Sequence, residues 1–151
     1  TEVAIGFTPI GGLVLGGAIY TATIPSLEVD DPGIGSGKYE YEVSQLAIFS
    51  PHIDFYPNPD RGLHFQGGFG FAAYIAGLAT PADSGRETRA HTATGLGFML
   101  GIGHDWWVGE QWSLGLLARV LYAWTEGSDP ESITWSHKTL APTAMVTATY
   151  H

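Results

Sequence analysis

Residues 63–75, with the sequence LHFQGGFGFAAYI, decide the fold class of this chain. The odd positions hold Leu, Phe, Ala and Ile apart from one glycine, whereas the even positions hold His, Gln, Gly, Ala and Tyr. Successive side chains of a β-strand point to opposite faces of its sheet. This period of two therefore predicts a strand with one apolar face and one small or polar face.

The same alternation recurs in residues 95–107, 112–125 and 139–150, and more weakly in residues 13–20 and 41–57. A soluble β-sandwich alternates too, but its second face carries charged side chains toward water. Here glycine takes many of those positions, and glycine weakens a strand unless something needs the space. The interior of a barrel of about eight strands is narrow, so small inward residues fit it and the large residues face outward to lipid.

The composition agrees with a protein whose solvent is partly lipid. Charged residues make up 14% of the 151 positions and hydrophobic residues 44%, whereas charge usually reaches roughly 25%. No apolar run is long enough for a transmembrane helix, and 21 glycines and nine prolines disfavour a helix bundle. A closed β-barrel is the other structure that a bilayer accepts. We expect residues 1–151 to form one such domain.

Composition also excludes several kinds of site. Cysteine is absent from the sequence, so there is no disulfide framework, thiol nucleophile or zinc–thiolate site. The formal net charge of −9 argues against nucleic acid as a partner, because a polyphosphate requires a basic face. The glycines of residues 67–70 follow the strand repeat and not a strand-to-helix turn, so they do not indicate a nucleotide cofactor.

The connections between the predicted strands alternate in length. The short ones are rich in turn-forming residues and cover residues 8–11, 57–62 and 108–111. The long ones are polar and acidic and cover residues 24–40, 79–90 and 126–136. Outer-membrane barrels have short periplasmic turns and longer extracellular loops. We therefore predict a bacterial outer-membrane location, with the short turns and the C-terminus in the periplasm and the long loops outside.

Counting the strands raises the question of closure. The alternating segments cover residues 2–8, 12–24, 41–57, 62–78, 92–108, 111–125 and 137–150, which makes seven. Single-chain bacterial barrels have even strand numbers, and an open sheet edge is not viable in lipid. We predict an all-β, antiparallel up-and-down transmembrane β-barrel of eight strands whose first strand is missing from this chain or supplied by another. No signal peptide is visible at Thr1, so we expect a mature or truncated product.

Aromatic residues gather at the two ends of the predicted strands, as in the interfacial girdles of membrane barrels. A general preference of strands for aromatics does not explain their depletion in mid-strand. The predicted girdle residues are Tyr20, Tyr41, Phe55, Tyr74, Trp106, Trp112, Tyr122, Trp124, Trp135 and Tyr150.

Arg119 is the only basic residue in the middle of a predicted strand, on the small-residue face. A buried cation is costly unless it is paired, so we expect an inward acid beside it, with Glu42 or Asp54 as candidates. The predicted polar network of the interior consists of Glu42, His52, Asp54, His64, Gln66 and Arg119.

Two constellations resemble catalytic or metal sites. Ser50, His52 and Asp54 share one strand face, but same-face neighbours are about 6.5–7 Å apart, too far for a hydrolase relay. A polar interior network is the favoured interpretation, with no catalytic residue. His64, Gln66, His104 and Asp105 lie near the same end, but without a metal-ligand spacing, so we expect neither a metal nor another cofactor.

Several stretches resemble the outer-membrane β-barrel-domain proteins of Gram-negative bacteria, especially hypothetical ones from myxobacteria-like lineages. The resemblance rests on GLVLGGAIY at residues 12–20, HIDFYPNPDRGLHFQGGFGFA at residues 52–72 and the closing TATYH at residues 147–151. It implies an eight-stranded barrel, generally without an assigned activity. The usual terminal signal ends in Phe, whereas this chain has Tyr150 followed by His151.

Three functions stay open at this point. The first is a non-enzymatic barrel in contact with outer-membrane lipid, which acts as a structural element, anchor or interaction platform through its acidic loops; another protein chain that completes or caps the barrel is a candidate partner. The second is a lipid-modifying hydrolase, which requires Ser, His and acid side chains in contact. The third is a carrier of a small apolar ligand. A filled eight-stranded interior conducts poorly, which disfavours a porin-like role.

Overall fold

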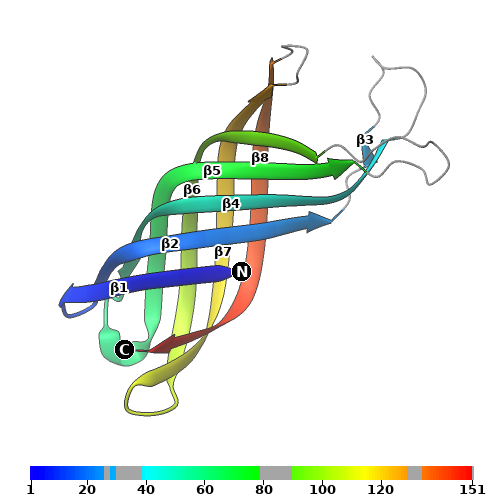
Figure 1. Ribbon diagram of the computed structural model, residues 1–151. Helices are drawn as coiled ribbons and strands as arrows, with labels where there is room; N and C mark the ends of the chain where they lie inside the picture. The colour runs from blue at the N-terminus through cyan, green and yellow to red at the C-terminus, as the bar shows by residue number, and fades with distance from the viewer. Residues whose placement is uncertain (26–27, 30–38, 79–89, 129–133, 151) are drawn as a thin grey trace.

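The computed structural model describes residues 1–25, 28–29, 39–78, 90–128 and 134–150. The strands are β1 (Glu2–Ile10), β2 (Leu13–Pro25), β3 (Glu28–Val29), β4 (Tyr39–Phe55), β5 (Leu63–Leu78), β6 (Ala90–Trp107), β7 (Trp112–Ser128) and β8 (Thr134–Tyr150). All except β3 form one sheet in the order β1-β2-β4-β5-β6-β7-β8, as Figure 1 shows. The predicted all-β class and the seven strands are confirmed, and the predicted bounds agree within three residues.

Every neighbouring pair in this sheet is antiparallel, from β1 with β2 to β7 with β8. The sheet curls strongly, so that β1 lies across the concave side from β7 and β8 (Figure 1). Within the described ranges no backbone ladder joins β1 to β8, and the sheet is not closed into a barrel. The sequence did not predict β3, which pairs with the start of β4 inside the first long connection.

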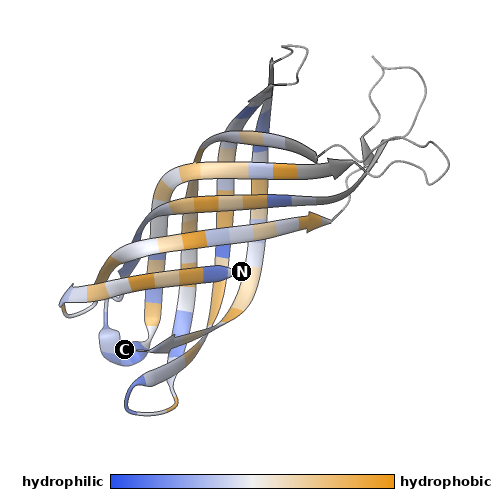
Figure 2. Cartoon of the chain, viewed as in Figure 1, coloured by the Kyte–Doolittle hydropathy of each residue, from blue (hydrophilic) through white to orange (hydrophobic). Residues whose placement is uncertain are grey.

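The two faces of the sheet differ as the alternation predicts. In β5, Phe69 is 57% exposed on the convex face, whereas His64 is 2% exposed on the concave face. Figure 2 shows the apolar positions as orange bands that recur along the strands. Large apolar residues on the convex face remain exposed from β1 through β8. Away from β1 and the end of β8, the concave face is mostly buried, and it is lined by small, polar and a few large apolar side chains.

The curled sheet buries its apolar core on the concave side. The largest fully buried apolar side chains come from β2, β4, β6 and β7 and are Tyr20, Leu46, Ile48, Met99, Leu117 and Leu121. A glycine two strands away in the sheet makes room for one of them. A Cβ added to Gly97 would lie 2.8 Å from the Ile48 side chain, closer than real Cβ atoms approach. The interior is therefore filled across this level of the sheet.

The short connections are tight turns. The β1–β2 turn ends at Gly12, whose φ of 83° favours glycine. Between β4 and β5, Asn58 accepts a hydrogen bond from the Asp60 backbone N–H at 3.1 Å and caps the short helix η1 (Pro59–Arg61), and Gly62 follows with a φ of 70°. The described part of the chain contains no helix long and apolar enough to cross a membrane.

Candidate functional site

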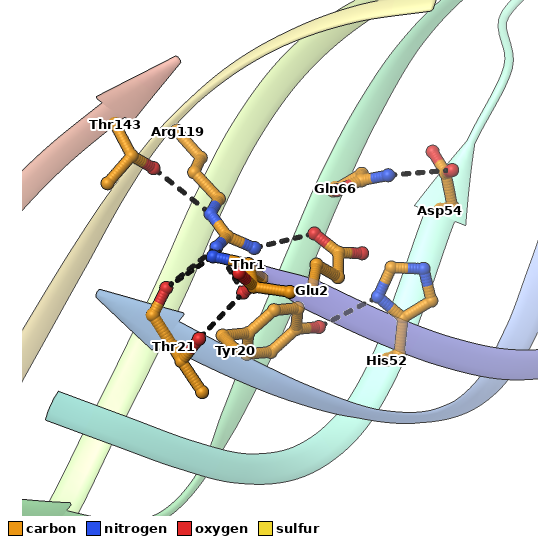
Figure 3. Close-up of polar contacts among 9 residues, drawn as sticks. All are labelled: Thr1, Glu2, Tyr20, Thr21, His52, Asp54, Gln66, Arg119 and Thr143. Atoms are coloured by element: carbon orange, nitrogen blue, oxygen red, sulfur yellow. Dashed lines mark hydrogen bonds and ion pairs between the residues drawn. The ribbon is translucent and has the colours of Figure 1, made fainter. Parts of the chain in front are cut away.

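Arg119 lies on the concave face of β7 and is 3% exposed. Its Nε donates to Thr143 Oγ1 on β8 at 3.1 Å, and its Nη1 donates to Glu2 Oε2 on β1 at 2.6 Å. Its Nη2 donates to the carbonyl oxygens of Thr1 and Thr21 at 2.8 and 3.3 Å. Figure 3 shows these contacts meeting on one guanidinium. Arg119 therefore connects β7, β8, β1 and β2 across the interior, and we call this set of contacts the Arg119 clasp.

The expectation of an inward acid beside Arg119 is confirmed, but Asp54, one of the two candidates, was wrong. The acid is Glu2, at the start of β1. Asp54 instead accepts hydrogen bonds from other side chains, and the side chain of Glu42 lies outside the described residues. The curl of the sheet places β1 opposite β7, so a residue from the far edge of the sheet comes closest to the guanidinium.

A second polar group occupies the interior near the short turns. Asp54 Oδ2 accepts a hydrogen bond from Gln66 Nε2 at 3.1 Å and lies 3.0 Å from His64 Nδ1. Asp105 Oδ2 accepts from the Tyr56 hydroxyl at 2.9 Å and lies 4.0 Å from His64 Nδ1. We call these five residues the turn-end cluster. His64 lies between its two carboxylates, so its imidazole connects the two halves.

The turn-end cluster contains predicted and missed residues. Asp54, His64 and Gln66 were predicted, and the structure brings them together. Tyr56 and Asp105 were not assigned to the network, although the alternation already placed each of them on the inward face of its strand. Burial, with the nearby carboxylates of Asp54 and Asp105, raises the pKa of the Tyr56 hydroxyl. This hydroxyl therefore stays protonated and donates to Asp105.

Ser50, His52 and Asp54 each have a different partner. The Ser50 hydroxyl donates to the Pro51 carbonyl at 2.9 Å, and His52 Nδ1 lies 2.7 Å from the Tyr20 hydroxyl. Figure 3 shows His52 turned toward Tyr20 while Asp54 faces Gln66. The three residues therefore do not form a Ser–His–Asp relay in this structure.

Of the four residues considered for a metal site, three belong to the turn-end cluster (His64, Gln66 and Asp105), whereas His104 is separated from them. His104 lies on the convex face, where its ring centroid is 4.7 Å from that of Trp106 in a tilted arrangement, whereas His64 and Asp105 are buried on the concave face. Among the residues that the structure describes, no group of three or more His, Asp or Glu side chains could hold a metal ion.

The predicted girdle needs correction at two positions. Phe55, Trp106, Trp112, Trp124 and Tyr150 are exposed on the convex face, and Tyr122 lies among them with its ring 4.6 Å from that of Trp124.

Tyr20 and Tyr74 are instead buried on the concave face, at 0% and 8% exposure. The prediction for these two tyrosines was wrong, because a place near a strand end fixes depth but not the face of the sheet. The side chains of Tyr41 and Trp135 lie outside the described residues.

Glycines of the concave face make room for the turn-end cluster. A Cβ added to Gly103 would overlap the imidazole ring of His64, and one added to Gly115 would overlap Asp105 Oδ1 and lie 2.6 Å from Thr147 Oγ1. The polar side chains of one strand thus occupy the space above a glycine of the next. This explains why glycine, and not only a small residue, recurs on this face.

We expect Gly103→Ala to lower the free energy of unfolding by about 1–3 kcal/mol, the usual range for overpacking a buried site. The new methyl group would displace the His64 ring from Asp54. Gly17→Ala is the matched control, because a Cβ at this exposed strand glycine meets no atom within 4 Å. Urea unfolding of both variants measures the difference, and equal midpoints would contradict this packing.

Comparison of this chain with models of known protein families, with curated proteins and with solved structures finds no match.

Proposed function

We propose that this protein is a non-enzymatic transmembrane β-barrel of a bacterial outer membrane. It serves as a structural element, anchor or interaction platform through its long acidic loops. The observation that carries the proposal is the apolar convex face. Large apolar side chains such as Ile5, Leu100 and Val146 are exposed there by 82, 61 and 76%, and comparable residues lie exposed on the other strands of the sheet.

An apolar surface of this extent suits lipid better than water. Soluble monomers rarely expose contiguous apolar patches of more than a few hundred Å². Here the exposed apolar residues follow the strands around the curled sheet. The exposed Trp and Tyr residues among those described lie toward the strand ends, whereas exposed phenylalanines such as Phe69 also lie in mid-strand. Arg119, a cation in the middle of β7, points inward and is paired. Each of these features is expected when the convex face contacts hydrocarbon and the strand ends lie at its interfaces.

The proposed barrel is closed by eight strands, of which β1, β2 and β4–β8 are seven. In the proposed orientation the short turns and the C-terminus lie in the periplasm, and the long connections lie outside the cell. The filled interior favours a structural or binding role over that of an open, porin-like channel.

The two alternatives gain no support from the described residues. A lipid-modifying hydrolase requires a serine or other nucleophile in contact with His and an acid, whereas Ser50 and His52 have separate partners. A carrier of a small apolar ligand requires an open apolar interior, whereas Leu46, Ile48, Met99 and Leu121 fill the core.

Refolding into lipid vesicles tests the proposal. The urea-denatured chain, diluted into phosphatidylcholine vesicles, should float with the vesicles and migrate on unheated gels as a compact band that heating removes. Vesicles extracted with carbonate should retain the protein, which distinguishes insertion from surface binding. A compact monomer that stays in the aqueous phase in the presence of vesicles would contradict the proposal.

A further inference from the structure

We propose that the seam between β1 and β8 is an acceptor site for one β-strand that runs antiparallel to both edges. The large apolar side chains of this added strand would face outward, and its small or hydroxyl-bearing side chains would face inward. The seam is defined by the backbone edges of β1 and β8 that have no neighbour in the described sheet. This inference rests on the proposed membrane barrel and names the partner that completes it.

The directions of the strands determine what fits the seam. Six antiparallel pairings connect β1 to β8 in turn, so β1 and β8 run in the same direction, as Figure 1 shows. Direct pairing of these edges would be parallel, in a sheet that is otherwise antiparallel. One intervening strand of the opposite direction pairs with both edges in the pattern of the rest of the sheet.

Among the described residues, the concave face is most exposed along the seam. The inward residues of β4 and β7 are buried, including Ile48, Ser113 and Leu121. On β1 the inward-facing positions after Glu2 are exposed, and on β8 the inward residues nearest the C-terminus are only half-buried. These seam residues are Ala4, Gly6, Thr8, Thr143, Met145, Thr147 and Thr149. A strand in the seam would cover them as the other strands cover their neighbours.

The seam residues indicate the chemistry of the strand that fits. The Arg119 clasp already crosses the interior between Thr143 and Glu2, so an inward side chain at that level must be small. Nearer the turns, Thr147 Oγ1 and Asp105 Oδ1 border Gly115 and are buried without a hydrogen-bond partner within the described protein. An inward hydroxyl or amide group of the added strand could donate a hydrogen bond to one of these two oxygens. The apolar convex face continues to the edge of the sheet at Val3, Ile5 and Phe7. The outward residues of a strand in the seam must therefore also be apolar.

A second copy of this chain does not meet these requirements. All copies inserted in a membrane share one orientation, so the β1 and β8 edges of every copy run in one direction. Edges from two copies could meet only in parallel, and the interior would stay open at the contact. The occupant is therefore a single strand of opposite direction, and pairing between copies is an alternative outcome of the test.

Cross-linking to a strand peptide tests this inference, because the native sequence has no cysteine. The probe is a synthetic peptide with the sequence of β2, which runs antiparallel to both β1 and β8, and with Tyr20→Ser, so that its inward side chain at the level of Glu2 is small. It carries one cysteine in place of either Leu15 or Ile19, two outward positions with the same spacing as Phe7 and Val3. The full chain in vesicles carries Val3→Cys, Phe7→Cys or Val146→Cys, all at exposed convex positions. A control peptide has the same residues with adjacent positions exchanged, which reverses its two faces.

The expected result is directional. Val3 and Phe7 are about 13 Å apart along β1, and disulfide formation requires Cβ atoms within about 4.5 Å. The cysteine at position 15 should therefore react roughly tenfold more with Phe7→Cys than with Val3→Cys, and the cysteine at position 19 should show the reverse preference, since bound cysteines react at their high local concentration. Reaction with Val146→Cys reports pairing with the β8 edge. The face-reversed peptide should react with none above the level of free cysteine.

Three outcomes would overturn the inference. The first is equal reaction of the probe peptide and the face-reversed peptide. The second is the opposite directional preference. The third is the formation of disulfide-linked dimers of the chain that appear without peptide and block reaction with the peptide. Flotation and gel migration are recorded on the same samples. Failure of the peptide to react with vesicle-inserted protein refutes the acceptor seam alone, whereas protein that does not enter the vesicles refutes the proposed barrel.

Discussion

Replacing Arg119 with methionine should lower the free energy of unfolding by about 3–5 kcal/mol, the cost of breaking a buried ion pair by removing one partner. The Glu2 carboxylate would lose the Nη1 donor at 2.6 Å, and the carbonyl oxygens of Thr1 and Thr21 would lose Nη2. Methionine approximates the length of the side chain but supplies no hydrogen bond. Urea unfolding of the vesicle-inserted or detergent-refolded chain measures the effect.

Two further variants separate the ion pair from a general effect of charge. Arg61→Met removes a cation from the exposed turn between β4 and β5 and should change stability by no more than about 0.5 kcal/mol. In the double variant Arg119→Met with Glu2→Gln, the buried carboxylate is neutral, so part of the loss should be recovered. An Arg119→Met protein with an unchanged unfolding midpoint would refute the structural role of the clasp.

Leu100→Arg should cost about 2–4 kcal/mol in a bilayer, the range for a cation on the lipid-facing side of a barrel near the midplane. Leu100 lies in the middle of β6 and is exposed on the convex face. In a water-soluble protein the same change at an exposed position would alter stability by only about 0.5 kcal/mol. The size of the effect, measured by unfolding from vesicles, therefore shows whether this face is in contact with lipid or with water.

Val108→Arg is the matched control for depth. Val108 is about as exposed as Leu100, at 59% against 61%, but it lies in the short turn between β6 and β7. At an interface the cost of arginine falls to about 0–1 kcal/mol. If both variants lost the same stability, or neither lost any, the convex face would not lie in a hydrocarbon layer whose midplane is near Leu100.

The faces of the strands could be predicted from the sequence, because side-chain alternation is a local property of the backbone. In β5, His64 and Gln66 are buried and Phe65 and Phe69 are exposed, as their even and odd positions require. The turns could be predicted for the same reason, since Gly12 and Gly62 adopt conformations that favour glycine within a few residues of chain. The two-residue repeat was sufficient to predict the strand faces, and the turn-forming residues were sufficient to predict the turns.

Contacts across the interior could not be predicted in this way, because they depend on how the sheet curls. Glu2 pairs with Arg119 only because β1 is brought opposite β7, and nothing in the sequence near either residue encodes that distance. Tyr20 shows a related error. Its position near the end of β2 suggested a girdle residue, whereas its hydroxyl lies beside His52 in the interior. Depth along a strand and face of the sheet are independent, and both are needed to place a side chain.

The Arg119 clasp also has a kinetic consequence. Arg119 and Glu2 are 117 residues apart in sequence, so closing this contact early would confine nearly the whole chain before its hairpins could compensate the loss of entropy. The hairpins should therefore assemble first and the clasp last. An interaction absent from the folding transition state affects mainly the rate of unfolding. The clasp should thus govern how long the curled sheet persists and have little influence on how fast it assembles.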